Sequence, residues 1–358
     1  MSLLDKIKKN STIKETAVLS QSKFFTKKDM IPTSIPAINV ALSGRLDGGL
    51  TPGLTMWAGP SKHFKTAFSL LMAKSYMDKY DDAILLFYDS EFGTPQSYFD
   101  SFGIDTDRVV HTPITDIEQL KFDIMQQLDG KEGIVRGDHI IIIIDSIGNL
   151  ASKKEVEDAL DGKSVADMSR AKQIKSLFRM VTPYLTIKDI PMIVVNHTYK
   201  TMELYSKDIV GGGTGSYYSA DNIFILGRQQ DKDGTELMGY NFIINVEKSR
   251  YVREKSKIPI SVKFDGGISR WSGLLDMALE SGHIIKPTNG WYSLVNTETG
   301  EVGDKLRLKD LNKDFYMKLL SDKTFQSWVQ DRYQISSGSI ISNEDIDAEL
   351  EEVDDVAA

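Results

Sequence analysis

Residues 59–66 read Gly-Pro-Ser-Lys-His-Phe-Lys-Thr and lie between an apolar stretch, 54–58, and a helix-forming stretch, 67–79. A loop that begins with glycine after a strand and enters a helix at Lys-Thr is typical of phosphate binding, because N–H groups at a helix start bind phosphate oxygens. Phe64 occupies the position where the pattern has a second glycine. The segment nevertheless requires an α/β fold, because the loop needs a strand before it and a helix after it.

The loop also predicts its ligand. Lys65 is expected to contact the β and γ phosphates of ATP, and the Thr66 hydroxyl to hold Mg²⁺. A surface turn that merely contains Lys-Thr is the alternative, and the flanking strand and helix make it the weaker one. The residues predicted to bind the nucleotide phosphates are Gly59, Pro60, Ser61, Lys62, His63, Phe64, Lys65 and Thr66.

Strand-like and helix-like stretches alternate from Ile31 to about Asp265, which predicts a mostly parallel sheet with helices on both faces. We therefore expect an ATPase core over 31–270 and a small α+β domain over 271–335. Residues 1–30 hold too few apolar groups for a core and are expected to form an arm that contacts another subunit, a partly ordered terminus being the alternative. The apolar strand candidates are 84–88, 140–144, 192–195, 223–226 and 242–246.

Composition restricts the class of protein and its compartment. The 358 residues include no cysteine, which excludes a disulfide scaffold and a thiolate zinc site. No apolar run is long enough to cross a bilayer and the N-terminus is charged, so we expect a soluble cytoplasmic protein without a membrane partner. The net charge of −8 equals the eight acids of segment 344–355, and residues 336–358 read as a linker and acidic tail. The remaining chain is neutral, so its charge does not exclude a nucleic-acid partner.

Two acidic residues follow apolar strand candidates, at the edge where open α/β sheets place their ligands. Asp145 ends the run 140–144 and is expected to hold Mg²⁺ together with Thr66. Glu91 follows the strand 84–88 and is the predicted general base, because hydrolysis of ATP needs a carboxylate that polarises the attacking water. A solvated loop acid is the alternative for Glu91.

His197 follows the strand candidate 192–195 and should emerge at the same sheet edge, where it would sense the γ phosphate. A packed or exposed bystander is the alternative for a single histidine. The following segment, 199–215, mixes aromatic and basic residues and ends in glycines, a composition that suits single-stranded DNA. Its predicted DNA-binding residues are Tyr199, Lys200, Met202, Tyr205, Lys207, Gly212 and Gly213.

Segment 152–164 is expected to form a second loop, directly after the strand that ends at Asp145. Arg170, Lys172 and Arg179 recur along the helix-forming stretch beyond it and are predicted to contact DNA phosphates. A solvated helix face is the alternative for such a charge pattern.

The order of these motifs resembles the RecA-type recombinase family, and within it the recombinases of T-even-like phages. The resemblance runs from about Ile31 to Tyr292 and rests on the loop with Phe64, the run 88–93, the Asp145-Ser146 pair, Asn196-His197 with the glycine-rich loop, and the segment 248–250. It implies a RecA-like fold in which ATP lies between subunits, Lys248 and Arg250 reach the γ phosphate of the neighbour, and Tyr98 stacks on adenine. Segments 152–164 and 199–213 would be the two DNA-binding loops. His197 stands where bacterial relatives carry glutamine.

The resemblance implies an ATP-dependent DNA recombinase that forms a head-to-tail helical filament on single-stranded DNA. This filament would pair with homologous double-stranded DNA and exchange strands in recombination, repair and recombination-dependent replication. A mediator and a single-strand-binding protein would be its partners, and host cytoplasm its location if it is a phage protein. A ring helicase and a non-catalytic regulatory paralogue are the alternatives. The acidic tail would compete with DNA for the binding surface.

Overall fold

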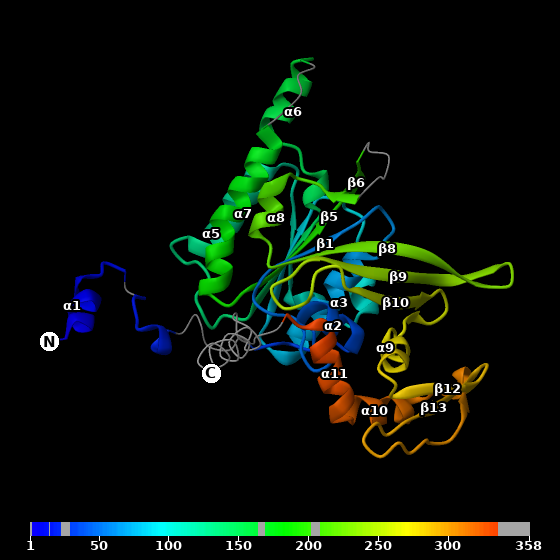
Figure 1. The fold of residues 1–358 in the computed structure, drawn as a ribbon. Helices are drawn as coiled ribbons and strands as arrows, with labels where there is room; N and C mark the ends of the chain where they lie inside the picture. The colour runs from blue at the N-terminus through cyan, green and yellow to red at the C-terminus, as the bar shows by residue number, and fades with distance from the viewer. Residues whose placement is uncertain (1, 14, 23–28, 164–168, 202–207, 336–358) are drawn as a thin grey trace, which may run out of the picture.

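The computed structural model describes residues 2–13, 15–22, 29–163, 169–201 and 208–335 (Figure 1). Its centre is a nine-stranded sheet in the order β11-β10-β9-β8-β1-β5-β4-β2-β3. The six strands from β8 to β3 in this order run parallel. These are β1 (Gly53–Ala58), β2 (Ile84–Asp89), β3 (Val109–Pro113), β4 (Ile140–Asp145), β5 (Pro191–Asn196) and β8 (Asn222–Asp233).

The remaining strands of the large sheet are antiparallel. They are β9 (Glu236–Lys248), β10 (Lys257–Lys263) and β11 (Gly267–Ile268). Stretch 242–246 lies in β9 and is therefore not part of the parallel alternation in which it was expected. The reason is the connection Gly234-Thr235, which is too short for the crossover that a parallel strand requires. Figure 1 shows β8 and β9 extending together as a long ribbon beyond the sheet.

Helices cover both faces of the sheet, as the alternating pattern predicts. Trp57 of β1 packs on one face with Phe68 of α3, and its neighbour Met56 packs on the other with Phe178 of α7, because successive strand residues point to opposite faces. The helices of the first face are α2 (Pro36–Ser43) and α3 (Lys65–Lys79), and those of the second are α5 (Ile117–Asp129) and α7 (Ser169–Ile187). This confirms a large, mostly parallel α/β sheet.

Shorter elements follow the polar ends of β2, β4 and β5 along the chain. They are α4 (Gln96–Ser101), η3 (Ile147–Asn149), α6 (Lys153–Leu160), β6 (Thr198–Lys200), β7 (Asp208–Val210) and α8 (Thr214–Ser219). The expected loop at 152–164 is wrong over 153–160, which form α6. Ser152 and Glu155 form a capping box at the start of α6, which stabilises the helix although the charged composition of the segment suggested a loop.

The C-terminal part forms a small unit beside the sheet, with a three-stranded antiparallel sheet and helices (Figure 1). Phe325 and Val329 of its last helix join the core of the α2 and α3 face. The Gln334 side chain donates to the carbonyl oxygen of Ser43 at 3.1 Å, which ties the end of the described chain to α2. The unit consists of α9 (Leu274–Glu280), β12 (Ile284–Thr288), β13 (Trp291–Leu294), β14 (Leu306–Arg307), η4 (Leu308–Asp310), α10 (Lys313–Ser321) and α11 (Lys323–Tyr333).

At the N-terminus, α1 (Leu3–Asn10) stands apart from the sheet in Figure 1 and buries none of its residues. The segment after it contains the short helix η1 (Leu19–Gln21), and η2 (Thr106–Arg108) precedes β3. Within the described ranges, no helix has both the length and the apolar character that crossing a membrane requires.

Candidate functional site

The loop between β1 and α3 has a backbone conformation that glycine favours at the position where the phosphate-loop pattern has its second glycine. Phe64 has φ +59°, the left-handed conformation that glycine adopts most easily, and Lys62 has φ +61°. The Phe64 ring packs on Phe242 of β9 with ring centroids 5.0 Å apart. This contact stabilises a backbone conformation that is costly for a side chain, and it explains how phenylalanine fits at this position.

Lys65 is the first residue of α3 and points back into the loop. Its ammonium group donates hydrogen bonds to the carbonyl oxygens of Gly59 at 3.0 Å and Pro60 at 2.8 Å. The side chain is buried, and burial lowers its pKa. The hydrogen bonds of this buried ammonium group go to neutral carbonyl oxygens, and Glu91 and Asp145 act on it only as nearby charges. A direct ion pair with a phosphate would therefore stabilise it, so this lysine is suited to bind a phosphate.

Thr66 and Asp145 form the polar centre of the site. The Thr66 hydroxyl donates to Oδ2 of Asp145 at 2.7 Å, whereas Oδ1 is buried without a hydrogen-bond partner among the described residues. Burial, as the largest cause, raises the pKa of Asp145 to about 6. A hard oxygen ligand without a partner beside a hydroxyl fits Mg²⁺, which is usually bound by one or two carboxylates together with substrate phosphates.

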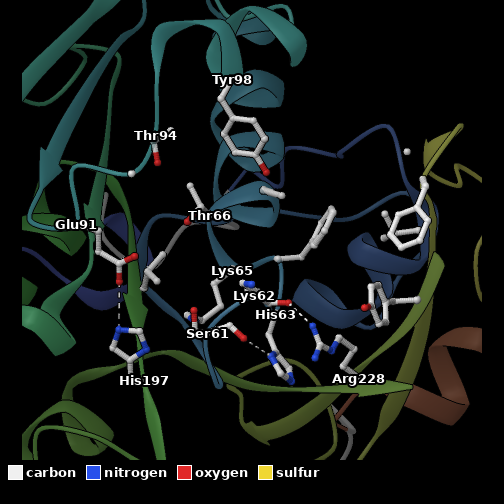
Figure 2. Close-up of a pocket in the computed structure, with 18 of the residues that line it drawn as sticks. Ser61, Lys62, His63, Lys65, Thr66, Glu91, Thr94, Tyr98, His197 and Arg228 are labelled. Carbon is white, nitrogen blue, oxygen red and sulfur yellow. Dashed lines mark hydrogen bonds and ion pairs between the residues drawn. The ribbon is translucent and has the colours of Figure 1, made fainter. Parts of the chain in front are cut away.

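Glu91, Ser146 and His197 meet just beyond the ends of β2, β4 and β5. Figure 2 shows the pair formed by Glu91 and His197. Oε1 of Glu91 accepts hydrogen bonds from the Ser146 hydroxyl at 2.8 Å and from Nε2 of His197 at 3.1 Å. The bond from His197 is the largest cause of a lowered pKa for Glu91. The carboxylate is thus kept ionised at neutral pH, the state that a general base needs.

Three residues to which the sequence analysis assigned no role hold this cluster in place. Asp89, at the end of β2, accepts hydrogen bonds through Oδ1 from the backbone N–H groups of Glu91 at 3.0 Å and Phe92 at 2.8 Å. The Ser90 hydroxyl donates to the carbonyl oxygen of Ser146 at 2.7 Å. A Cβ atom on Gly148 would lie 2.4 Å from Cδ2 of His197. An aspartate two residues before Glu91 is the one local signal that could have been noticed, because Asp commonly accepts N–H groups two and three residues ahead.

Lys65, Thr66, Glu91 and His197 line a pocket of about 610 Å³ (Figure 2). Figure 2 shows Tyr98 and Thr94 on one side and Ser61, His63 and Arg228 on the other, with Lys65 between them. The pocket therefore brings Lys65, Thr66, Glu91, His197 and Tyr98 together, as expected from the sequence. Arg228, which sequence reasoning missed, donates to the Lys62 carbonyl oxygen at 3.2 Å and so supports the loop.

Lys248 and Arg250 do not line this pocket. The ammonium group of Lys248 donates to the carbonyl oxygens of Tyr217 at 2.7 Å and Tyr218 at 3.3 Å. Arg250 forms an ion pair with Asp221 and lines a second hollow beside α7 and α8. In a single subunit, therefore, both cations lie outside the phosphate site of their own chain.

The predicted DNA-binding residues on α7 differ in their surroundings. The Arg170 guanidinium donates to the carbonyl oxygens of Ile147, Gly148 and Leu150, so it holds the turn after β4. Lys172 and Arg179 are exposed on α7, and Arg179 lines the hollow that contains Arg250. Of the three predicted contacts on α7, Lys172 and Arg179 are thus the exposed ones, and Arg170 is half-buried.

Segment 199–213 begins and ends in a short antiparallel pair, β6 with β7, at the same sheet edge. Tyr199 is 55% exposed and Lys200 is exposed, and both lie on β6. Gly212 and Gly213 have φ values of +89° and +74°, so this turn into α8 favours glycine. The other predicted contacts, Met202, Tyr205 and Lys207, lie outside the described residues.

Comparison with known proteins agrees with this geometry. Residues 2–269 match the RecA N-terminal domain, and residues 271–329 match the C-terminal domain of the bacteriophage T4 recombination and repair protein. The chain is 53% identical to the recombination and repair protein of Enterobacteria phage T4, over 98% of this chain and 90% of that protein.

More distant relatives are bacterial. The chain is 27% identical to Protein RecA of Bacteroides thetaiotaomicron over 79% of its length and 83% of that protein. It is 26% identical to Protein RecA of Streptomyces rimosus over 79% of its length and 73% of that protein. With a family match over most of its length and a phage relative at 53% identity, the chain belongs to the RecA family of recombinases, in the branch that carries the C-terminal domain of the phage T4 recombination and repair protein.

Proposed function

We propose that the protein is a DNA-dependent ATPase that assembles head to tail on single-stranded DNA and exchanges strands with a homologous duplex. The observation that carries the proposal is that Lys65, Thr66 and Glu91 line one pocket, while Asp145 at the end of β4 accepts a hydrogen bond from Thr66 directly behind it. This arrangement provides a phosphate cation, a metal ligand pair and a general base, the parts that phosphoryl transfer to water requires. The family to which the chain belongs supports the recombination and repair role.

In the proposed mechanism, the loop carbonyls release Lys65 to the β and γ phosphates. Ionised Asp145, together with the Thr66 hydroxyl, would hold Mg²⁺, and the metal would neutralise charge on the phosphates. The Glu91 carboxylate accepts a proton from the attacking water, while Ser146 and His197 orient it through the hydrogen bonds that they donate to its Oε1. Tyr98 covers the base of the nucleotide at the far side of the pocket.

We further propose that Lys248 and Arg250 act on the neighbouring subunit. Their position outside the pocket of their own chain supports this, since a cation that stabilises transition-state charge must reach the γ phosphate. A repeated contact of this kind is heterologous and gives an open filament. His197 would sense the γ phosphate and transmit its state to β6 and the glycine-rich turn through the directly following residues.

DNA would lie at the edge formed by α7, β6 and the glycine-rich turn. Lys172 offers an exposed cation near the start of α7, and Tyr199 and Lys200 offer a ring and a cation on β6. Arg179 would extend this surface along α7 toward Asp221 and Arg250. Such pairs bind single strands without reading the sequence, because backbone charge and stacking are common to all bases.

We assign residues 1–30 to an arm, 31–270 to the ATPase core and 271–335 to the small domain. We also propose that the protein acts in the host cytoplasm.

The test measures ATP hydrolysis with and without single-stranded DNA, for the wild type and Glu91→Gln, with electron microscopy of the same samples. DNA-stimulated hydrolysis on helical filaments, lost in a Glu91→Gln variant that still forms filaments, is the expected result. Closed rings would indicate a helicase instead. Hydrolysis that does not respond to DNA would count against the recombinase and favour the two alternatives, the helicase and the regulatory paralogue.

A further inference from the structure

The two cations assigned to the neighbouring active site are both held in their own subunit by residues 217–221. The Arg250 guanidinium pairs with Oδ1 of Asp221, and the Lys248 ammonium group donates to the carbonyl oxygens that end α8. These side chains cannot keep such contacts while they also bind a neighbour's triphosphate. Assembly must therefore break contacts that the free subunit already has.

Asp221 is the fixed member of its ion pair. Its Oδ2 accepts a hydrogen bond from the backbone N–H of Leu54 at 2.8 Å, at the start of β1. Gly53 leaves room for this carboxylate, since a Cβ atom there would lie 2.2 Å from Oδ2. The Asp221 side chain is 17% exposed, whereas that of Arg250 is 68% exposed. The arginine is thus the partner that can leave.

A hollow of about 470 Å³ adjoins this pair and is lined by Lys175, Arg179 and Tyr218 as well as by Asp221 and Arg250. When Arg250 leaves, Lys175 and Arg179 remain beside the hollow as positive charges. The carboxylate can then be solvated and its charge offset, which avoids the cost of a buried unpaired ion. The arrangement therefore permits release of the arginine at a modest cost.

We propose that Asp221 is a latch that holds Arg250 in the free subunit and so opposes assembly until a nucleotide-loaded neighbour replaces the carboxylate. This inference rests on the proposed role of Arg250 in the neighbouring site. The latch makes filament growth depend on the neighbour's nucleotide, since only a group with several anionic oxygens competes well with a preformed ion pair. Loss of the Asp221 charge should release Arg250 and favour assembly.

The test is Asp221→Asn, because asparagine keeps an oxygen for the Leu54 N–H but removes the charge. The protein concentration needed for assembly with a non-hydrolysable ATP analogue and no DNA is measured by light scattering. It should fall about threefold, the scale of one partly exposed ion pair. Glu280→Gln is the matched control, since it removes an ion pair with Arg332 of 48% and 49% exposed side chains in the C-terminal unit. It should leave assembly unchanged.

The latch is overturned if Asp221→Asn has the melting temperature of the wild type but needs the same or a higher protein concentration than the wild type for assembly. If that variant unfolds, the Arg250 Nε–H is followed by NMR in the wild-type monomer. It should exchange with solvent more slowly than in an unfolded peptide, and equal exchange overturns the latch. Arg250→Ala separates the two proposals. If Arg250→Ala keeps DNA-stimulated hydrolysis, the role of Arg250 in the neighbouring site is rejected. If Arg250→Ala loses hydrolysis while Asp221→Asn assembles like the wild type, only the latch is rejected.

Discussion

The Thr66 hydroxyl donates a hydrogen bond of 2.7 Å to Oδ2 of Asp145 and leaves the other carboxylate oxygen of Asp145 buried, without a hydrogen-bond partner among the described residues. The first residue comes from the start of α3 and the second from the end of β4, 79 positions further along the chain. The contact joins the phosphate loop to the strand that supplies the metal ligand. The free-energy cost of ionising the buried Asp145 carboxyl is the basis of the first two predictions.

Asp145→Asn should stabilise the nucleotide-free protein at neutral pH while abolishing ATP hydrolysis. Burial raises the pKa of Asp145 from 3.8 to about 6, so the folded state is penalised when this group ionises. The penalty is absent below the unfolded pKa and complete above the folded one, at about 2 to 3 kcal/mol. Urea unfolding at pH 7.5 should give a higher free energy of unfolding for the variant. A lower value would mean that the ionised carboxylate stabilises the empty site.

Binding of Mg²⁺ and nucleotide should weaken as the pH falls below about 6, because Asp145 must lose its proton to bind the metal. Titration of a non-hydrolysable ATP analogue with Mg²⁺ between pH 5 and pH 8 measures this effect. The nucleotide also gains a proton in this range, so the informative quantity is the difference in slope between the wild type and Asp145→Asn. Identical slopes would contradict the assignment.

Gly148→Ala should lower ATP hydrolysis and move the acid limb of its pH profile to higher pH. The new methyl group would lie 2.4 Å from His197 and displace the ring from Glu91. Without the bond from His197, the pKa of Glu91 should rise, and the base would become protonated at a higher pH. A profile of kcat/KM against pH tests this. Gly266→Ala is the control, since nothing lies within 4 Å of its Cβ position, and it should leave the profile unchanged.

Phe64→Ala should destabilise the protein more than Phe64→Gly. Both changes remove the ring contact with Phe242, at a cost of about 2 to 4 kcal/mol. Only glycine adopts the φ of +59° without strain, which restores about 1 kcal/mol. The free energy of unfolding by urea gives the order of the two variants. An alanine variant at least as stable as the glycine variant would mean that the strain at this position is negligible.

Removal of residues 343–358 should tighten binding to single-stranded DNA, most strongly at low salt. The segment 344–355 holds eight acids and no base, and it lies outside the described residues. Repulsion between these acids and DNA phosphates is screened as the ionic strength rises. Fluorescence anisotropy over a series of salt concentrations measures the affinity and its salt slope. If truncation changes neither, the tail does not compete with DNA.

Local patterns in the chain were enough for the α/β class and for the functional strand ends. The stretch 54–66 predicts a strand, a loop and a helix start, and the acids at 91 and 145 follow apolar runs. Parallel strands end at a common sheet edge, so the meeting of these acids could be expected. The resemblance added the roles of Lys248, Arg250 and Tyr98, which no spacing could have supplied.

The pairings between side chains were decided by the tertiary structure alone. His197 and Glu91 are 106 positions apart in the chain, and they meet because β5 and β2 both neighbour β4 and end at the same sheet edge. Phe64 packs on Phe242 because β9 folds back beside β8. Likewise, the charge pattern of Arg170 could not reveal its carbonyl partners after β4. Periodicity along the chain reports local backbone conformation and the apolar face. Contacts between distant residues depend on sheet order and helix packing, which are set by the free energy of the whole fold.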